Sequence, residues 1–400
     1  LSNQSDFSWT LDNLIYYDKE FGKHSVGLTL LQSATGYHYE ESSMAAEGIP
    51  LESAKWNALS KENVSLLDEW NSGLIEKQLL SYMFRVNYDY NNKYLLTVSG
   101  RWDGASQLAE GNKWAFFPSA ALGWRLDQEE FLKDVTWLNQ LKFRLGVGVT
   151  GNSAIDPYQT KGAIVSLYYP FGSALAPGYA ASEPLIKDGA VAMANKNLSW
   201  EKTTQYNIGL DYSVLNGRIS GVLDFYTSRT TDLLMAMTIP SLNGYTNTYA
   251  NVGKTSNIGV DITLNTVNVK TRDFEWSTSI NAAWQKDKID ELANGKEDDI
   301  NNNWFIGQAL GVIYGYECGG LWKEEDAAEM AKFNAKGHSF QAGMVRPIDQ
   351  NGDYKIDPND DRVIIGHTRP RWTFGMTNTF TYKNFDLSVM MYGRFDYMVD

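Results

Sequence analysis

The residues best suited to binding a metal ion lie between positions 349 and 360. An EF-hand loop takes oxygen ligands from its positions one, three, five and twelve, and a backbone carbonyl from position seven. In this chain those positions hold Asp349, Asn351, Asp353, Asp360 and, through its carbonyl, Lys355. Clustered carboxylates repel one another unless a cation lies between them, so the spacing predicts a calcium loop whose role is to stiffen a connection.

Two departures from the EF-hand pattern leave an alternative open. Tyr354 stands where the sixth position usually needs glycine, and Asp360 is shorter than the usual bidentate glutamate. No pair of flanking helices is evident in the sequence. The same residues could form a loop of Asx turns, in which Asp and Asn side chains accept hydrogen bonds from their own backbone.

A second group of candidate residues is aromatic and lies in the Gly- and Pro-containing stretch 152–200. Aromatic faces suit stacking against sugar rings or contact with a covering protein, although the same rings could pack the stretch on itself. The candidate substrate-binding residues are Tyr158, Tyr168, Tyr169, Phe171 and Tyr179.

The sequence offers no catalytic constellation. It contains no nucleophile elbow, phosphate loop or HExxH motif. Paired acidic residues occur, but neighbours on a strand face opposite ways, so we expect solvated charges rather than a glycosidase pair. These pairs are Glu40-Glu41, Glu129-Glu130 and Glu324-Glu325. We therefore expect a protein that is not an enzyme.

Composition narrows the class of protein further. The 400 residues are 13% aromatic, yet the mean hydropathy is −0.37, and no segment approaches the roughly 20 consecutive apolar residues that a spanning helix needs. A net charge of −13 argues against a nucleic-acid partner. Cys318 is the single cysteine, which excludes an internal disulfide.

Apolar residues recur with a period of two, in paired runs joined by short turns. Residues 206–214 alternate, turn at Asn216-Gly217 and return through 219–225, which predicts a complete hairpin. The other predicted hairpins pair 82–88 with 94–102, 258–264 with 274–284, 372–380 with 385–391, 7–17 with 24–34, and 115–126 with 139–150. The fold class is therefore all-β, with about twelve strands of roughly ten residues, the length of a tilted membrane-crossing strand.

The connections differ greatly in length between the two ends of the strands. Tight turns alternate with long stretches, which is the layout of an outer-membrane barrel with short periplasmic turns and long outer loops. Aromatic residues at strand ends resemble interfacial girdles. The long stretches are about 35–79, 104–114, 152–200, 231–255 and 286–370.

The hairpins thus predict that 1–400 forms part of one transmembrane antiparallel β-barrel, as a fragment of about twelve strands. Opposite the apolar face, the alternation places a set of charged residues toward the lumen. They are Arg101, Asp103, Arg144, Asp211, Arg218 and Asp224.

An ordered series of short motifs resembles the SusC-like and RagA-like TonB-linked outer-membrane proteins. From about residue 80 onward the series covers most of the chain. It includes Arg101-Trp-Asp103-Gly104, Phe117-Pro118-Ser119, Gly148-Val149-Thr150-Gly151-Asn152, Asn197-Leu198-Ser199-Trp200, Asn251-Val252-Gly253 and Asp361-Arg362.

The resemblance implies an outer-membrane location and a 22-stranded barrel with a plug in its lumen. The plug, the TonB box and the signal peptide would precede Leu1, and the final strands would follow Asp400. It also implies TonB-ExbB-ExbD-driven import of oligosaccharides with a SusD-like surface lipoprotein. Peptide import by a RagA-like route, a passive porin and a secreted glycan-binding adhesin remain alternatives.

Overall fold

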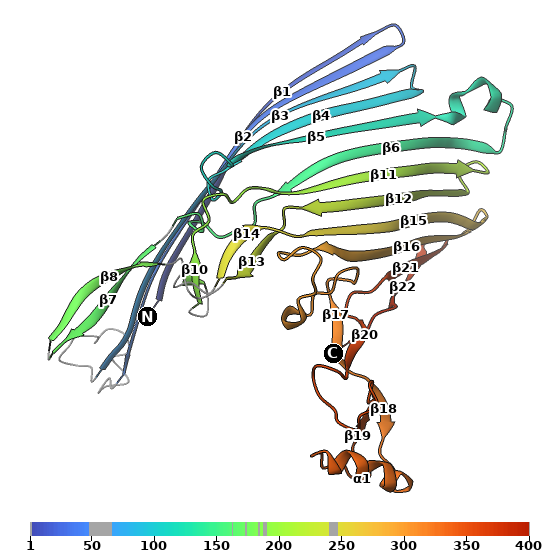
Figure 1. Ribbon diagram of the computed structural model, residues 1–400. Helices are drawn as coiled ribbons and strands as arrows, with labels where there is room; N and C mark the ends of the chain where they lie inside the picture. The colour runs from blue at the N-terminus through green and yellow to red at the C-terminus, as the bar shows by residue number, and fades with distance from the viewer. Residues whose placement is uncertain are drawn as a thin grey trace. The chain divides into compact units, whose positions relative to one another are not determined.

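The computed structural model describes residues 2–47, 66–161, 163–172, 174–182, 185–186, 190–239 and 247–399. Its main feature is a twelve-stranded antiparallel sheet in the order β1-β2-β3-β4-β5-β6-β11-β12-β15-β16-β21-β22 (Figure 1). This confirms the predicted fold class and strand number. The strands are β1 (Ser2–Phe21), β2 (His24–Glu47), β3 (Leu66–Tyr90), β4 (Tyr94–Ala105), β5 (Trp114–Arg125), β6 (Leu138–Asn152), β11 (Glu201–Val214), β12 (Ile219–Thr231), β15 (Lys254–Lys270), β16 (Phe274–Glu291), β21 (Trp372–Tyr382) and β22 (Phe385–Phe395).

Shorter elements lie in the connections. They are η2 (Leu126–Gln128), η3 (Glu130–Leu132), β7 (Ala163–Phe171), β8 (Ala174–Ser182), β9 (Leu185–Ile186), β10 (Ala190–Met193), β13 (Leu234–Thr238), β14 (Asn247–Asn251), η5 (Ile300–Asn302), β17 (Val312–Tyr316), β18 (Cys318–Leu321), η6 (Glu324–Asp326), α1 (Ala327–Ala335), β19 (Val345–Pro347) and β20 (Arg362–His367). Within the described ranges, no helix is long and apolar enough to cross a membrane.

Contacts divide the chain into two compact units. The first unit comprises residues 1–133, 142–207 and 230–252, and the second comprises 134–141, 208–229 and 253–400.

Short turns in the first unit follow from residues that tolerate a left-handed backbone. Asn91 and Asn92 have φ values of 56° and 54° and join β3 to β4. Positive φ at both central positions is the condition for a tight hairpin turn, and asparagine meets it at little cost. Asn92 N also donates a 2.7 Å hydrogen bond to Asp89 Oδ1. The turn predicted here is therefore confirmed.

The predicted long loop at 35–79 is wrong over most of its length. β2 runs to Glu47 and β3 begins at Leu66, so only the intervening residues are not described as strand. β1 pairs with β2 from Phe21↔His24 to Ser2↔Ser43, and β2 pairs with β3 as far as Glu47↔Leu66. Backbone pairing continues although the sequence there is mostly polar. β2 and β3 continue beyond the ends of β4 and β5 (Figure 1).

The other long stretches contain small strands outside the main sheet. The stretch 152–200 holds the β7–β8 hairpin, 231–255 holds β13 and β14, and 286–370 holds β17 to β20 with α1. They remain connections between neighbouring strands of the main sheet, all leaving from the same ends of those strands, because each strand is antiparallel to the next.

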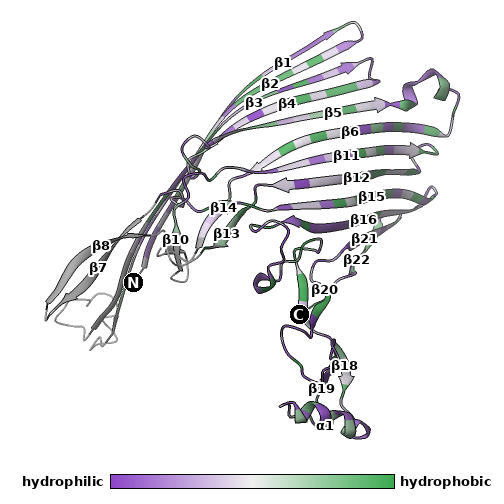
Figure 2. Ribbon diagram, viewed as in Figure 1, coloured by the Kyte–Doolittle hydropathy of each residue, from purple (hydrophilic) through white to green (hydrophobic). Residues whose placement is uncertain are grey.

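One face of the strands exposes large apolar side chains. Hydrophilic and hydrophobic residues alternate along strands such as β4 and β6 (Figure 2). In β12, Leu223 and Phe225 are 39% and 43% exposed. A water-soluble sandwich buries such a face against a second sheet. Here it is left open in strand after strand, as a lipid-facing surface requires.

The second unit carries a small module between β17 and β20. α1 packs Met330 and Phe333 against Trp322, with Phe340, Tyr354 and Ile356 around them. The ring centroids of Trp322 and Phe333 lie 5.6 Å apart in an edge-on arrangement. This module has its own apolar core, and the calcium-loop candidate forms one side of it.

Candidate functional site

The acidic loop 349–360 directs its side-chain oxygens at its own backbone. Asp349 accepts hydrogen bonds from the N–H groups of Gly352 and Tyr354, each at 2.7 Å. The Oδ1 atoms of Asn351 and Asp353 each accept from the N–H two residues later. Tyr354, with φ of 63°, makes the turn for which an EF-hand uses glycine. These contacts form the Asx-turn arrangement that was the alternative to a calcium site.

Asp361 closes this loop, and the sequence pattern did not single it out as a ligand. Its side chain is fully buried, and its two oxygens accept from Gln350 N at 2.9 Å and Asp357 N at 2.8 Å. Asp360, the predicted ligand, instead donates its N–H to Asp357. The sequence signal that could have pointed to Asp361 was its place in the Asp361-Arg362 motif. Among the described residues, no three His, Cys, Asp or Glu side chains converge as metal ligands.

Charges beside the loop are paired. The Lys355 ammonium donates a 2.9 Å hydrogen bond to Asp357 Oδ2. That bond, helped by two backbone N–H groups, lowers the pKa of the Asp357 carboxyl. The same carboxylate raises the pKa of Lys355. An internal lysine thus supplies positive charge within the acidic loop.

Of the five candidate aromatic residues, the structure describes the side chain of Tyr158. Tyr168, Tyr169 and Phe171 are in β7, and Tyr179 is in β8, where Tyr179 pairs with Ser166. The side chains of these four lie outside the described part of the structure. Tyr158 has a φ of 73° and lines a cavity.

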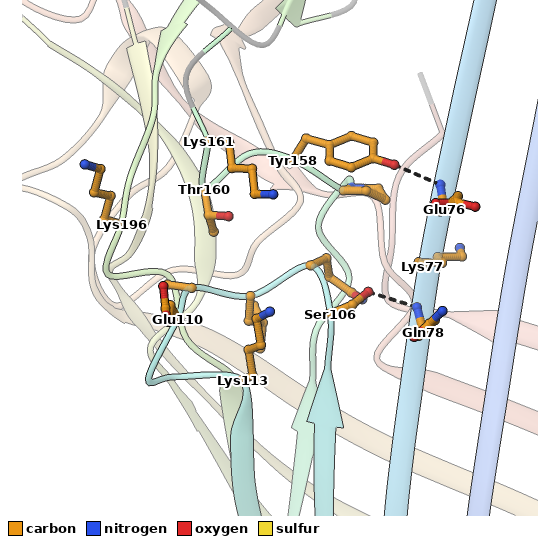
Figure 3. Close-up of a pocket in the computed structure, with 14 residues that line it drawn as sticks. Glu76, Lys77, Gln78, Ser106, Glu110, Lys113, Tyr158, Thr160, Lys161 and Lys196 are labelled. Atoms are coloured by element: carbon orange, nitrogen blue, oxygen red, sulfur yellow. Dashed lines mark hydrogen bonds between the residues drawn. The ribbon is translucent and has the colours of Figure 1, made fainter.

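This cavity in the first unit has a volume of about 1020 Å³. It lies where β3 outgrows β4, since β4 pairs only as far as Leu79↔Ala105. Beyond that point, the N–H of Glu76 donates to Tyr158 Oη at 3.1 Å, and the N–H of Gln78 donates to Ser106 Oγ at 2.9 Å (Figure 3). Loop side chains thus replace the missing strand along this edge of β3.

The motif Asn197-Leu198-Ser199-Trp200 holds the 106–113 wall of the cavity. Trp200 is 5% exposed, donates its indole N–H to Lys113 O at 2.8 Å, and meets the Phe117 ring edge-on at 5.3 Å. Leu198 is fully buried, and its carbonyl accepts from Ala109 N at 3.1 Å. A residue noted for its place in a motif therefore positions a wall of the cavity.

Asn251 and Gly151 support that wall from behind. Asn251 exchanges hydrogen bonds with both the N–H and the carbonyl of Ser199, at 2.7 and 2.8 Å. A Cβ atom at Gly151 would come within 2.1 Å of the Phe117 ring, so only glycine fits at that position. Both residues belong to the motifs that the sequence had marked, and both have packing roles.

The cavity lining is strongly charged. Four lysines and two glutamates contribute to it, in a chain whose overall charge is negative. Figure 3 shows Lys113 and Lys161 beside the 106–113 loop, with Lys196 farther from β3. The sequence analysis missed this group because its members come from segments far apart in the chain. The lining comprises Glu76, Lys77, Gln78, Ser106, Gln107, Leu108, Ala109, Glu110, Lys113, Pro157, Tyr158, Thr160, Lys161 and Lys196.

The polar face of the strands is also ordered. Arg101 donates to Asp103 Oδ1 at 2.6 Å and to Ser81 Oγ at 2.9 Å. Asp103 is 9% exposed and Ser81 is 1% exposed. Since neighbouring residues on a strand point to opposite faces, this network lies opposite the exposed ring of Trp102. The observed contacts agree with the predicted charged face on this strand.

Another predicted assignment needs correction. Glu129 was expected to be a solvated charge, yet its side chain is only 14% exposed and contacts Lys93 Nζ at 2.6 Å. It also accepts hydrogen bonds from Tyr94 Oη and Trp124 Nε1. Its role is to fasten the β5–β6 connection to the β3–β4 turn. Glu130, whose side chain is 84% exposed, is solvated as expected.

Comparisons with known proteins agree with this architecture. The chain is 32% identical over 393 residues to TonB-dependent receptor P3 of Formosa agariphila, covering 94% of this chain and 38% of that protein. It is 34% identical over 354 residues to TonB-dependent receptor SusC of Bacteroides thetaiotaomicron, covering 83% and 33%. It therefore spans between a third and two fifths of the length of these relatives.

The fold is shared with a solved transporter. The structure titled the RagAB peptide importer in the open-open state superimposes with a TM-score of 0.83 at 22% sequence identity, covering 99% of this chain and 41% of that one. Residues 1–398 also match the family described as TonB dependent receptor-like, beta-barrel. The chain belongs to this family of TonB-dependent outer-membrane β-barrels.

Proposed function

We propose that the protein imports oligosaccharides across the outer membrane, driven by TonB and assisted by a SusD-like surface lipoprotein. The match of residues 1–398 to the TonB-dependent barrel family supports transport most directly. In this proposal the barrel acts as a transporter and not as an enzyme. Energy coupling passes through a TonB-ExbB-ExbD complex, and passage is controlled by a plug inside the barrel.

The structure favours this proposal over a secreted glycan-binding adhesin. An adhesin built as a sandwich would bury the apolar faces of its strands. Leu223 and Phe225 on β12, and Tyr206 and Ile208 on β11, are instead exposed. A lipid environment removes the cost of exposing them.

The cavity in the first unit is where we expect the substrate to be captured. It lies beside the β4–β5 connection, one of the long connections, and long connections of outer-membrane barrels face outward. Its lining is mostly polar and includes an aromatic ring, that of Tyr158, whose side chain is half exposed. Polar groups with an aromatic platform suit a sugar chain. The aromatic residues of β7 and β8 are proposed as further contacts.

Peptide import is the second candidate. The observation that favours it is the fold match to a structure titled a peptide importer. At 22% identity that likeness shows the fold alone, whereas the polar residues of the cavity and the Tyr158 ring suit a sugar chain. We therefore rank oligosaccharide first.

Purification of the native protein from the outer membrane in mild detergent tests the proposal. We expect a surface lipoprotein to co-purify in equal amount, together with a glycan that mass spectrometry identifies. A retained peptide would support the second candidate. A barrel recovered alone that conducts solutes passively in liposomes would contradict the importer and favour a porin.

We also propose that the loop 349–360 binds calcium, with Asp349, Asn351, Asp353, the Lys355 carbonyl and Asp360 as ligands. Binding would require Asp349 to give up its hydrogen bonds from Gly352 and Tyr354. Isothermal titration with CaCl2, before and after the Asp349→Asn change, tests it. Equal heats for the two proteins would exclude the site.

A further inference from the structure

The cavity in the first unit collects positive charge from four separate segments, one of which contributes Lys196. Lys77 comes from β3, Lys113 from the end of the β4–β5 connection, and Lys161 from the stretch after β6. The protein as a whole carries a net charge of −13, so this concentration is a local reversal of sign. All four lysines are exposed, so solvent screens their mutual repulsion, and an anion that enters the cavity can approach several ammonium groups.

Most of these ammonium groups have no internal counter-ion. Within the part of the chain that the structure describes, no ion pair engages Lys113, Lys161 or Lys196. Lys77 lies over the Tyr37 ring, 4.6 Å from its centroid. By contrast, other lysines of this unit find carboxylates, as Lys93 does with Glu129 at 2.6 Å. Two glutamates, Glu76 and Glu110, also line the cavity, but neither is within ion-pair distance of the lysines Lys113, Lys161 or Lys196 in the described part of the chain.

The two glutamates in the lining do not cancel this charge. Glu76 already faces His38, whose Nδ1 lies 3.0 Å from Glu76 Oε1. The Glu76 carboxylate still carries its charge, so with Glu110 the lining holds two glutamates against four lysines. The cavity therefore presents an excess of cationic donors to whatever enters it.

The walls fix the backbone at two of these lysines, Lys113 and Lys161. The backbone of Lys113 is fixed by the Trp200 indole, which donates to its carbonyl at 2.8 Å. Lys161 N donates to Tyr158 O at 2.8 Å, and the Tyr158 hydroxyl is tied to β3. Preformed walls reduce the ordering that binding must impose on the site. A charged ligand group between Lys113 and Lys161 would meet two donors at once.

We infer that this cavity is a subsite for an anionic group of the imported substrate, a carboxylate or a sulfate, so that the protein prefers acidic oligosaccharides over neutral ones. The inference rests on the proposed import function and specifies its substrate class. Hydrogen bonds between ammonium and carboxylate are stronger than those between neutral groups, so they select for the charged ligand. The polar lining and Tyr158 remain available to the neutral part of the chain.

Binding to the purified native protein in detergent tests the inference independently of uptake. The probes are tri-galacturonate and neutral galactotriose, measured by isothermal titration at about 0.05 and 0.15 M salt. We expect tri-galacturonate to bind at least tenfold more tightly, with the difference shrinking as salt rises because the charges are screened. The double variant Lys113→Gln/Lys161→Gln should lose that tenfold preference and still bind galactotriose.

The matched control is Lys270→Gln. Lys270 lies at the β15–β16 turn in the second unit and already pairs with Glu275 at 3.0 Å, so its loss should leave the preference unchanged. Folding of each variant is checked by its heat-dependent mobility on gels. Equal affinity for the two trisaccharides, or a preference that survives in the double variant, would overturn the anionic subsite.

Two further measurements distinguish a failure of the anionic-subsite inference from a failure of the proposed import function. A peptide with a free carboxyl terminus and its amidated form replace the sugars. If only the free peptide shows the lysine-dependent preference, then the anionic subsite stands and the oligosaccharide proposal falls. If neutral sugar is bound and imported but charge has no effect, then the import proposal stands and the anionic inference fails.

Discussion

At the scale of single residues, the most informative positions are those that tie separate segments together. Trp200 joins the 106–113 wall to Phe117, and Glu129 joins two turns. Trp200 was noted in the sequence as part of a motif, whereas Glu129 was predicted to be a solvated charge. A single glutamate in a turn carries no periodic signal, and its three partners become visible only once β3, β4 and β5 are aligned.

Trp200→Ala should destabilise the first unit by about 3–5 kcal/mol, since it removes a buried indole and leaves a cavity. It also frees the Lys113 carbonyl and should loosen the cavity wall. Denaturant titration in detergent measures the loss. Trp137→Ala serves as the control, because Trp137 is 58% exposed and its removal should change stability by less than about 0.5 kcal/mol. Equal effects would argue against a structural role for Trp200.

Glu129 predicts a pH dependence. The hydrogen bond from Lys93, followed by that from Tyr94, lowers the pKa of the Glu129 carboxyl. A carboxyl with a lowered folded-state pKa contributes stability above its unfolded value of about 4.3, and that contribution is lost as the pH falls through the folded-state value. Stability measured from pH 7 down to acid should therefore fall more steeply in the native protein than in Glu129→Gln. If stability falls equally steeply with pH in the native protein and in Glu129→Gln, then Glu129 does not have this role. Glu297→Gln changes an exposed residue and is the control.

At the scale of elements, alternation predicted which strands exist and how they pair, but not how far they extend. The hairpin at Asn91-Asn92 and the pairing of β15 with β16 were readable because apolar residues alternate there and turn residues punctuate them. In β2 and β3, pairing continues through polar residues such as His38, opposite Glu76, where neither face needs to be apolar. Alternation of apolar and polar residues indicates that one face of a strand is buried or contacts lipid. It cannot predict a strand whose two faces are both polar.

The module around α1 should fold through its own core. Phe333 is 3% exposed and touches Trp322, Phe340 and Tyr354. Phe333→Ala should cost the module about 3–5 kcal/mol and open it to proteolysis between β17 and β20, while the main sheet stays intact. Limited proteolysis with mass spectrometry locates the cuts. Phe131→Ala, at a residue 68% exposed in η3, should leave the digestion pattern unchanged. Protection of the module in Phe333→Ala would show that its core does not hold it together.

At the scale of the whole molecule, the exposed apolar face determines where the protein resides. Val98 is 37% exposed on β4, and Thr97, its neighbour, lies on the opposite face and donates to Asn87. Val98→Lys should cost about 2–4 kcal/mol of folding stability in lipid, and Thr97→Lys much less, because a charge is tolerated on the lumen side. The folded fraction of each variant in liposomes, measured at increasing urea concentration, gives the difference in stability. A larger loss of stability in Thr97→Lys than in Val98→Lys would contradict this assignment of the two faces.

The cavity illustrates the limit of sequence reasoning about function. Its lining joins β3, the β4–β5 connection, the stretch after β6 and Lys196, and no local pattern links these segments. Of the aromatic candidates, Tyr158 lines it, whereas Tyr168, Tyr169, Phe171 and Tyr179 belong to the β7–β8 hairpin. The motifs identified residues that hold the 106–113 wall of the cavity. The positive charge of the cavity became apparent only from the arrangement of the chain in space.

Energised uptake is the property that distinguishes an importer from a porin or an adhesin, so it is the most direct test. Cells that express the native protein should be supplied with labelled tri-galacturonate, with TonB present and with TonB deleted, and the label inside the periplasm should be measured over time. We expect accumulation that depends on TonB, is saturable, and falls when Lys113 and Lys161 are changed to glutamine. Uptake that is equal in both strains would contradict it, because a passive pore would then explain the flux.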